Sequence, residues 1–216
     1  GLKKIAIATD IANEWSITFR DIFINKMKKY PNVVLVANES IKGGDTDFYA
    51  VLTKIKSKSP DGLFVMMQIN EAANFVKQAD ELNVGAQLFS AQGCSDPAFI
   101  KAAGKSANGL IAISMYEPTN VKNDVSRRFT ENFYKKYGNL DMDPGLYDAQ
   151  TYDAIYFIAD ALKRAGTKEK EKLLDALRNT SNLQGVIGIT TLDENGQAFK
   201  DVLLVKIVDG KKEVVE

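Results

Sequence analysis

Five short, mostly apolar runs recur along the first half of the chain, and they constrain its fold more than any other feature. Neighbouring side chains of a strand point to opposite faces of a sheet, so a run without alternation is typical of a strand buried on both faces. Helical patterns separate the runs. This order predicts an α/β chain with a Rossmann-like, doubly wound, mainly parallel sheet and right-handed crossovers. The expected strands are residues 5–8, 33–36, 63–67, 87–90 and 110–114.

The segments between these runs place apolar residues at helical spacing. The first helix carries its apolar face over residues 19–27, and the second begins at Thr46 and Asp47, with an acid in its first turn. Further helices are expected over residues 71–82 and 97–103.

The second half of the chain is mainly helical. Helices are expected over residues 128–137 and 147–164, closed by Gly138 and Gly166, and over residues 168–179. The helix over 147–164 is apolar over a wide arc, which is typical of a helix covered on more than one side. Residues 186–192 and 202–208 then predict a C-terminal, hairpin-like strand pair around Asn195-Gly196.

Composition excludes several classes of function. The chain has 28 Lys and Arg against 28 Asp and Glu, so no charge excess favours nucleic acid or an anionic membrane. It has no histidine and a single cysteine, Cys94, which excludes Ser-His-Asp and Cys-His catalysis, histidine metal sites and an internal disulfide. No phosphate-binding glycine motif follows the first strand. We therefore expect no metal and no cofactor.

Ligands of open parallel sheets bind beyond the carboxyl ends of the strands. The residues in those positions are mostly small, polar or aromatic, which suits a neutral polar ligand held by hydrogen bonds and ring stacking. Trp15 can stack on a ligand, and the amide of Gln92 can both donate and accept. The candidate segments are 10–16, 68–70, 91–95 and Tyr116.

Each of these positions has a structural alternative. Loop residues at strand ends are polar in most proteins, and Trp15 can instead pack within its own loop. Asp10 and Glu14 form a carboxylate pair that keeps an α/β enzyme open as a less favoured interpretation. Cys94 is interpreted as a small filler beside the loop.

An ordered set of motifs resembles a known family. The set comprises Lys3 to Ile7, residues 43–48 (GGDTDF), residues 52–55 with 60–62 (LTKI and PDG), residues 152–155 (YDAI) and residues 192–196 (LDENG). Together they resemble the branched-chain amino-acid-type substrate-binding proteins of ABC transporters, over nearly the whole chain. The resemblance implies the periplasmic binding protein type I fold, with the chain as its C-terminal lobe portion and without the N-terminal lobe.

The resemblance also implies a division of the chain. Residues 1–124 correspond to the second ligand-binding lobe, residues 125–182 to helices that cross onto the first lobe, and residues 183–216 to strands that return to the second lobe. The apolar arc over 147–164 would then lack its usual partner. We expect this surface to be covered by self-association, as in a homodimer through the exposed helices.

Four ligand-binding residues follow from the resemblance, position by position. Trp15 and Gln68 stand where the family places aromatic residues, and Tyr147 stands at the aromatic that starts the helix crossing the hinge. Gln92 stands where amino-acid binders place an acid for the ligand's ammonium group. A neutral amide does not supply that charge, which puts an aliphatic amino-acid ligand in doubt, and neither Asp10 nor Glu71 is aligned to compensate.

The implied function is solute binding by hinge closure, followed by transfer to a membrane permease. The implied location is the periplasm or the cell exterior, with a lipid anchor at the outer face of the membrane as one variant. A sensory domain of the same fold is the alternative, and catalysis is not expected. Since one wall of a cleft leaves half of a ligand in water, we expect this chain alone to bind weakly or not at all.

Overall fold

The computed structural model describes residues 1–140 and 142–215, which form two compact units. Unit 1 combines residues 1–113 with 204–215, and unit 2 consists of Ser114–Leu203. These contact-based boundaries differ from the divisions at 124 and 182 expected from the sequence. That residues 125–182 pack on another lobe stays a prediction.

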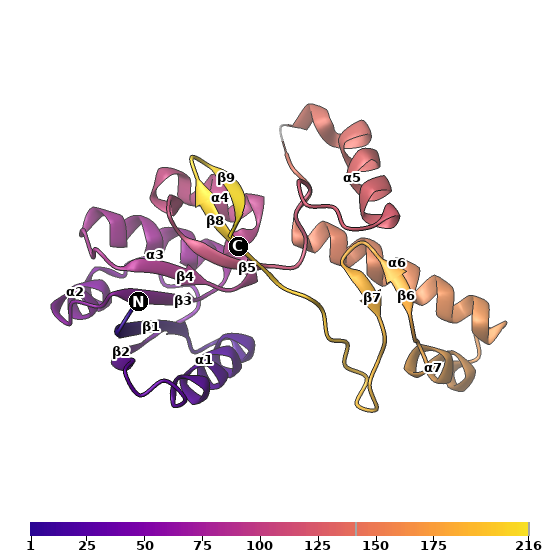
Figure 1. Ribbon diagram of the computed structural model, residues 1–216, viewed down its shortest axis with the longest axis horizontal. Coiled ribbons are helices and arrows are strands. Elements are labelled where there is room, and N and C mark those ends of the chain that lie inside the picture. Colours follow the sequence, from indigo (N-terminus) through magenta and orange to yellow (C-terminus); the bar gives the residue numbers. More distant parts are fainter. Residues whose placement is uncertain (141, 216) are drawn as a thin grey trace. The chain divides into compact units, whose positions relative to one another are not determined.

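Unit 1 is built on a mixed, mainly parallel sheet (Figure 1). In the described part of the chain this sheet has seven strands in the order β2-β1-β3-β4-β5-β8-β9. Strands β1 to β5 pair in parallel, whereas β8 and β9 are antiparallel. The α/β fold expected from the sequence is confirmed. The strands are Lys4–Asp10 (β1), Val34–Ile41 (β2), Gly62–Met66 (β3), Gln87–Ser90 (β4), Ile111–Ser114 (β5), Leu203–Val208 (β8) and Lys211–Val215 (β9).

The main core of unit 1 lies between one face of the sheet and three helices, α2 (Tyr49–Ser57), α3 (Ile69–Glu81) and α4 (Pro97–Ala103). Leu63, Val65 and Ile207 of the sheet and Phe75 and Phe99 of the helices are fully buried in this core. The opposite face is covered by α1 (Glu14–Met27), whose Phe19 and Phe23 pack with Ile5, Ile7 and Met66. Figure 1 shows α1 on one side of the strands and α3 and α4 on the other.

Helix starts follow the local capping chemistry. Asn13 caps α1 by accepting the Ser16 N–H at 3.1 Å, and Asp96 caps α4 directly before Pro97. The expected start of α2 at Thr46 and Asp47 was wrong, because the helix begins at Tyr49. The Gln78 side chain holds the preceding segment instead: it accepts the Phe48 N–H at 2.7 Å and donates to the Thr46 carbonyl at 2.8 Å.

Unit 2 contains three α-helices within the described residues, α5 (Asp124–Tyr137), α6 (Leu146–Ala165) and α7 (Lys170–Arg178), besides the short 3₁₀ helix η3 (Gly138–Leu140). Strands β6 (Leu183–Gly185) and β7 (Gly188–Thr190) form a small antiparallel pair. A second core joins α5, α6 and this pair, and its buried residues include Phe129, Phe133, Leu146 and Val186. Among the described residues, no helix is long and apolar enough to cross a membrane.

The expected pairing of residues 186–192 with 202–208 was wrong. Strand β7 pairs with β6, and β8 pairs with β9 through Asp209 and Gly210. Both turn residues have positive φ, 49° and 76°, as a tight two-residue hairpin of primed type requires. The Asn195-Gly196 turn is instead closed by the Asp193 carboxylate, which accepts the N–H groups of Asn195 and Gln197 at 2.9 and 2.8 Å.

Candidate ligand-binding edge of the sheet

The carboxyl ends of β1, β3 and β4 lie side by side, because these strands are consecutive neighbours in the parallel sheet. Three of the four predicted site residues follow these strands in unit 1. Trp15 lies in the first turn of α1 after β1, Gln68 precedes α3 after β3, and Gln92 begins the 3₁₀ helix η1 (Gln92–Ser95) after β4. The fold therefore brings Trp15, Gln68 and Gln92 to one edge of the sheet.

The Trp15 side chain is held by a ring contact but remains partly exposed. Its ring stacks on Phe19, with the centroids 5.4 Å apart and the planes 20° from parallel. Since Phe19 packs on the sheet as part of the core under α1, the stack holds the indole at the edge. The Trp15 side chain nevertheless stays 43% exposed, which leaves aromatic surface available for a ligand.

The two amides differ in how far they are buried. Gln68 is the exposed N-cap residue of α3, with an extended backbone at φ −71° and ψ 163°. Gln92 is half-buried, and its backbone carbonyl accepts the Ser95 hydroxyl at 2.7 Å. The backbone at Gln92 is thus tied into η1, while its side chain carries the donor and acceptor that a polar ligand requires.

A further part of this edge was missed in the sequence analysis, the loop after β2. A Cβ added at Gly43 would lie 3.4 Å from both carboxylate oxygens of Asp10 and 3.2 Å from the Ala12 side chain. The next residue, Gly44, donates its N–H to Glu71 at 3.1 Å. The Gly43-Gly44 pair was the available signal, since paired glycines in a loop mark a close backbone approach.

Two candidate tyrosines have different surroundings in unit 2: Tyr116 was proposed at the end of a strand, and Tyr147 at the start of the helix that crosses the hinge. Tyr147, the fourth predicted site residue, lies in the first turn of α6 and is 45% exposed. Tyr116 is buried in the core of unit 2, and its hydroxyl hydrogen-bonds Thr130 at 2.8 Å. Burial raises the pKa of Tyr116 to about 12. Tyr116 is therefore a core residue, which corrects its inclusion among the candidates.

The titratable groups at the edge have ordinary structural roles. Cys94 is fully buried, and desolvation raises the pKa of its thiol to about 12, so a reactive thiolate does not form near neutral pH. Asp10 is buried and accepts the Ala12 N–H at 2.9 Å. Across the described residues, no group of three or more Cys, Asp or Glu side chains is placed to hold a metal ion.

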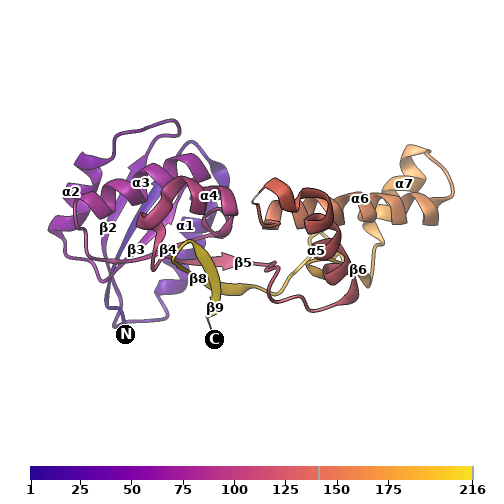
Figure 2. The same ribbon diagram turned by 90° about the horizontal axis from the view of Figure 1, so that it is seen from above.

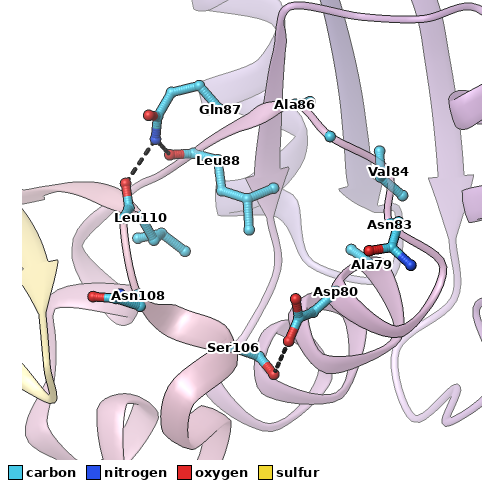
Figure 3. A pocket seen from close by; sticks show the side chains of 12 residues that line it. Ala79, Asp80, Asn83, Val84, Ala86, Gln87, Leu88, Ser106, Asn108 and Leu110 are labelled. Carbon is cyan, nitrogen blue, oxygen red and sulfur yellow. Dashed lines mark hydrogen bonds between the residues drawn. The ribbon is translucent and has the colours of Figure 1, made fainter.

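A separate cavity of about 290 Å³ lies at the opposite, amino edge of β4 and β5 (Figure 3). Its polar groups bind protein atoms around the cavity. The Ser106 hydroxyl donates to Asp80 at 2.9 Å, and the Gln87 amide donates to the carbonyls of Leu88 and Gly109 at 2.9 and 2.7 Å. Because these groups already have partners, the cavity is a weaker candidate than the carboxyl edge.

The sequence model of the periplasmic binding protein family matches residues 1–212. The chain belongs to this family. A leucine-binding protein from Thermotoga maritima is 30% identical, with a TM-score of 0.93 over 100% of this chain and 60% of its own. A branched-chain amino acid transporter substrate-binding protein from Streptococcus pneumoniae, solved with isoleucine, is 28% identical, with a TM-score of 0.88 over 99% of this chain and 60% of its own.

A curated relative gives the same family assignment. The leucine-, isoleucine-, valine-, threonine- and alanine-binding protein of Pseudomonas aeruginosa is 22% identical over 174 residues, which is 80% of this chain and 45% of that protein. This periplasmic binding protein chain thus spans less than half of that curated relative and 60% of the two solved structures. The resemblance found in the sequence is confirmed at the level of family and fold. The ligand-binding roles of Trp15, Gln68, Gln92 and Tyr147 stay predictions.

Proposed function

We propose that the chain is part of the solute-binding component of an ABC transporter and forms one wall of an interlobe cleft. The ligand is a small polar molecule, either an amino acid or a related amide or carboxylate. The observation that carries the proposal is the carboxyl edge of unit 1, where an indole and two amides follow three neighbouring parallel strands. Side chains of this kind hold small ligands by stacking and directed hydrogen bonds. Membership of the periplasmic binding protein family supports the same function.

The proposed mechanism is hinge closure without catalysis. Ligand bound at the edge of unit 1 is clamped by a second lobe, with Tyr147 contributing an aromatic side chain from the start of α6. The closed protein is then recognised by a membrane permease in the periplasm or at the cell exterior. The high pKa of the Cys94 thiol favours binding over nucleophilic chemistry.

The charge that the ligand carries at this position depends on the side chain of Gln92. The carboxylates of Asp10 and Glu71 stabilise loops of unit 1, since Asp10 accepts the Ala12 N–H and Glu71 accepts the Gly44 N–H. The Gln92 amide is neutral and pairs equally well with an amide or a carboxylate. We therefore favour a ligand whose group at this position carries no positive charge.

Titration calorimetry with a Trp15→Ala variant tests the site. The protein should be prepared at the full length of its relatives and titrated with amino acids, small amides and aromatic acids. Loss of the stacking surface is expected to weaken binding by about fivefold, since such contacts contribute roughly 1 kcal/mol. Tyr30→Ala, at an exposed tyrosine beyond the end of α1, is the matched control. Equal effects of the two substitutions would contradict the site.

A Gln92→Glu variant tests the ligand's charge. It keeps the shape of the side chain and adds one negative charge, so affinity for the wild-type ligand should fall while affinity for leucine or isoleucine rises. Gln197→Glu, in the exposed turn of unit 2, controls for net charge. If Gln92→Glu changes neither affinity, Gln92 lies outside the binding site.

A further inference from the structure

The sequence contains two Asn-Gly pairs, Asn108-Gly109 and Asn195-Gly196. Asparagine is a chemically labile residue. Its side-chain carbonyl carbon is open to attack by the main-chain nitrogen of the next residue, and a glycine in that position has no Cβ to hinder the attack. The two pairs are therefore the places in this chain where such a reaction meets the least steric resistance.

The local backbone does not distinguish the two pairs. Gly109 and Gly196 both have positive φ, 84° and 76°, and a Cβ added at either glycine would meet no atom within 4 Å. Both asparagines are exposed to solvent. A difference in reactivity between the pairs must therefore come from the hydrogen bonds that hold them.

The pair Asn108-Gly109 is held by a distant part of the chain. The Gly109 N–H donates to the Ile207 carbonyl at 2.7 Å, and the Asn108 side-chain oxygen accepts the Asp209 N–H at 3.1 Å. Ile207 is a fully buried residue of β8, and β8 is the neighbour of β5 in the sheet of unit 1 (Figure 2). Freeing the Gly109 nitrogen therefore requires β8 to separate from the sheet.

The pair Asn195-Gly196 is held only by its immediate neighbours in the turn. The Gly196 N–H donates to the Asp193 carbonyl at 3.0 Å, and the Asp193 carboxylate accepts the N–H groups of Asn195 and Gln197 at 2.9 and 2.8 Å. Exposed turns with local hydrogen bonds open at a small cost in free energy, whereas core strands open at a cost close to that of global unfolding. The Gly196 nitrogen can thus be released while both cores stay intact.

We propose that Asn195 is a site of spontaneous deamidation in the folded protein, and that pairing with β8 protects Asn108. The deprotonated main-chain nitrogen of Gly196 attacks the Cγ atom of Asn195. A new C–N bond closes a cyclic succinimide, the bond from Cγ to the amide nitrogen breaks, and ammonia leaves with the proton. Water then adds to either imide carbonyl carbon and breaks its bond to nitrogen, which leaves aspartate or isoaspartate at position 195.

The product changes the turn in two ways. The formal net charge of the chain is zero, so each event makes it negative by one, in a turn that already contains Asp193 and Glu194. Isoaspartate also lengthens the main chain by one carbon between the two N–H groups that the Asp193 carboxylate binds. We therefore expect the modified turn to be looser. This inference does not depend on which solute the protein binds.

Peptide mapping by mass spectrometry tests the proposal. The 216-residue chain is incubated in mildly alkaline buffer, which favours loss of the proton from the attacking nitrogen, both folded and unfolded in guanidinium chloride. In the folded chain, Asn195 should be modified at least about tenfold faster than Asn108, because only its turn opens locally. In guanidinium chloride the two rates should be similar, since each asparagine is followed by glycine.

Two matched substitutions identify the site independently. Ion-exchange chromatography follows the main acidic species that forms from the folded chain. Asn195→Ser removes the reacting carbonyl and should abolish this species, whereas Asn108→Ser should leave its rate of formation unchanged. The mapping of the unsubstituted chain needs neither variant, so a folding defect in one of them would not leave the proposal untested.

Three results would overturn the proposal. The first is equal or faster modification of Asn108 in the folded chain. The second is persistence of the main acidic species in Asn195→Ser. The third is an Asn195 that stays intact in the folded chain while it is modified in guanidinium chloride, which would show that the turn does not open. Solute binding enters none of these measurements, so failure here is distinguishable from failure of the proposed function.

Discussion

At the scale of single residues, Asp153 is the clearest example of a side chain that organises backbone. Its carboxylate accepts the N–H of Val186 at 2.6 Å and that of Ile187 at 3.0 Å, and so ties α6 to the turn between β6 and β7. A Cβ at Gly185 would lie 2.6 to 2.7 Å from the carboxylate atoms of Asp153. Glycine at this position therefore reflects the close approach of the carboxylate.

Replacing Gly185 by alanine should weaken unit 2. The added methyl group must displace the Asp153 carboxylate, and overpacking of this kind costs about 1–3 kcal/mol. Gly138→Ala is the control, since Gly138 has a helical φ of −60° and open space where its Cβ would lie. Urea unfolding monitored by circular dichroism measures both variants. Equal stabilities would show that the Asp153 contact contributes little.

The buried thiol of Cys94 predicts a dependence on alkaline pH. Desolvation raises its pKa from 9.0 to about 12, so the unfolded chain loses this proton at lower pH than the folded chain. The stability contributed by the protonated thiol is therefore complete below pH 9 and is lost as the pH rises from 9 towards 12. Cys94→Ala should show a smaller decrease in unfolding free energy over this range. A thiol reagent should label native Cys94 only at the rate of unfolding.

At the scale of secondary-structure elements, Asn123 joins α5 to the small strand pair. Its side-chain oxygen caps α5 by accepting the Ser126 N–H at 2.9 Å, and its amide nitrogen donates to the Gly185 carbonyl at 3.2 Å. One side chain thus supplies both the start of a helix and a tertiary hydrogen bond.

Two substitutions at Asn123 separate these contributions. Asn123→Ala removes both hydrogen bonds and should destabilise unit 2 by about 1–2 kcal/mol. Asn123→Asp keeps the cap oxygen but loses the donor to Gly185, so a smaller loss is expected. Thermal unfolding and the helical content of α5 provide the comparison. If aspartate is as damaging as alanine, the contact with Gly185 outweighs the cap.

The elements that were predicted correctly are marked by characteristic residues at their own ends. The helix over residues 97–103 follows Asp96, begins with Pro97 and ends before Gly104, and the structure places α4 over the same residues. The strand pairing around Asn195 was wrong because two other short turns form the hairpins: β6 pairs with β7 across Val186 and Ile187, and β8 pairs with β9 across Asp209 and Gly210. The site shows a further limit. Strand order is sufficient to predict that Trp15, Gln68 and Gln92 lie at one edge of the sheet. The burial of Tyr116 against Thr130 instead depends on how α5 packs.

At the scale of the whole molecule, the described residues form separate cores. Ile207 belongs to the main core of unit 1, and Phe129 to the core of unit 2. Chains divided in this way commonly depart from two-state unfolding.

Truncations in the two cores should therefore act locally. Ile207→Ala should cost about 2–5 kcal/mol and speed exchange in β4 and β5, while α6 is unaffected. Phe129→Ala should have the reverse effect. Native-state hydrogen exchange resolves the two patterns. A single substitution that speeds exchange equally in both units would show that they unfold as one.

The sheet of unit 1 is assembled from two stretches of chain, and this has a consequence for biosynthesis. Val205 and Ile207 of β8 complete its core, yet the whole of unit 2 is translated before them. While the ribosome is still making unit 2, the nascent unit 1 exposes the flank of β5 where β8 will pair. Unit 2 is a continuous segment, so its folding does not depend on residues that are translated later. A released chain that ends at Leu203 should leave unit 2 able to resist protease while unit 1 is digested.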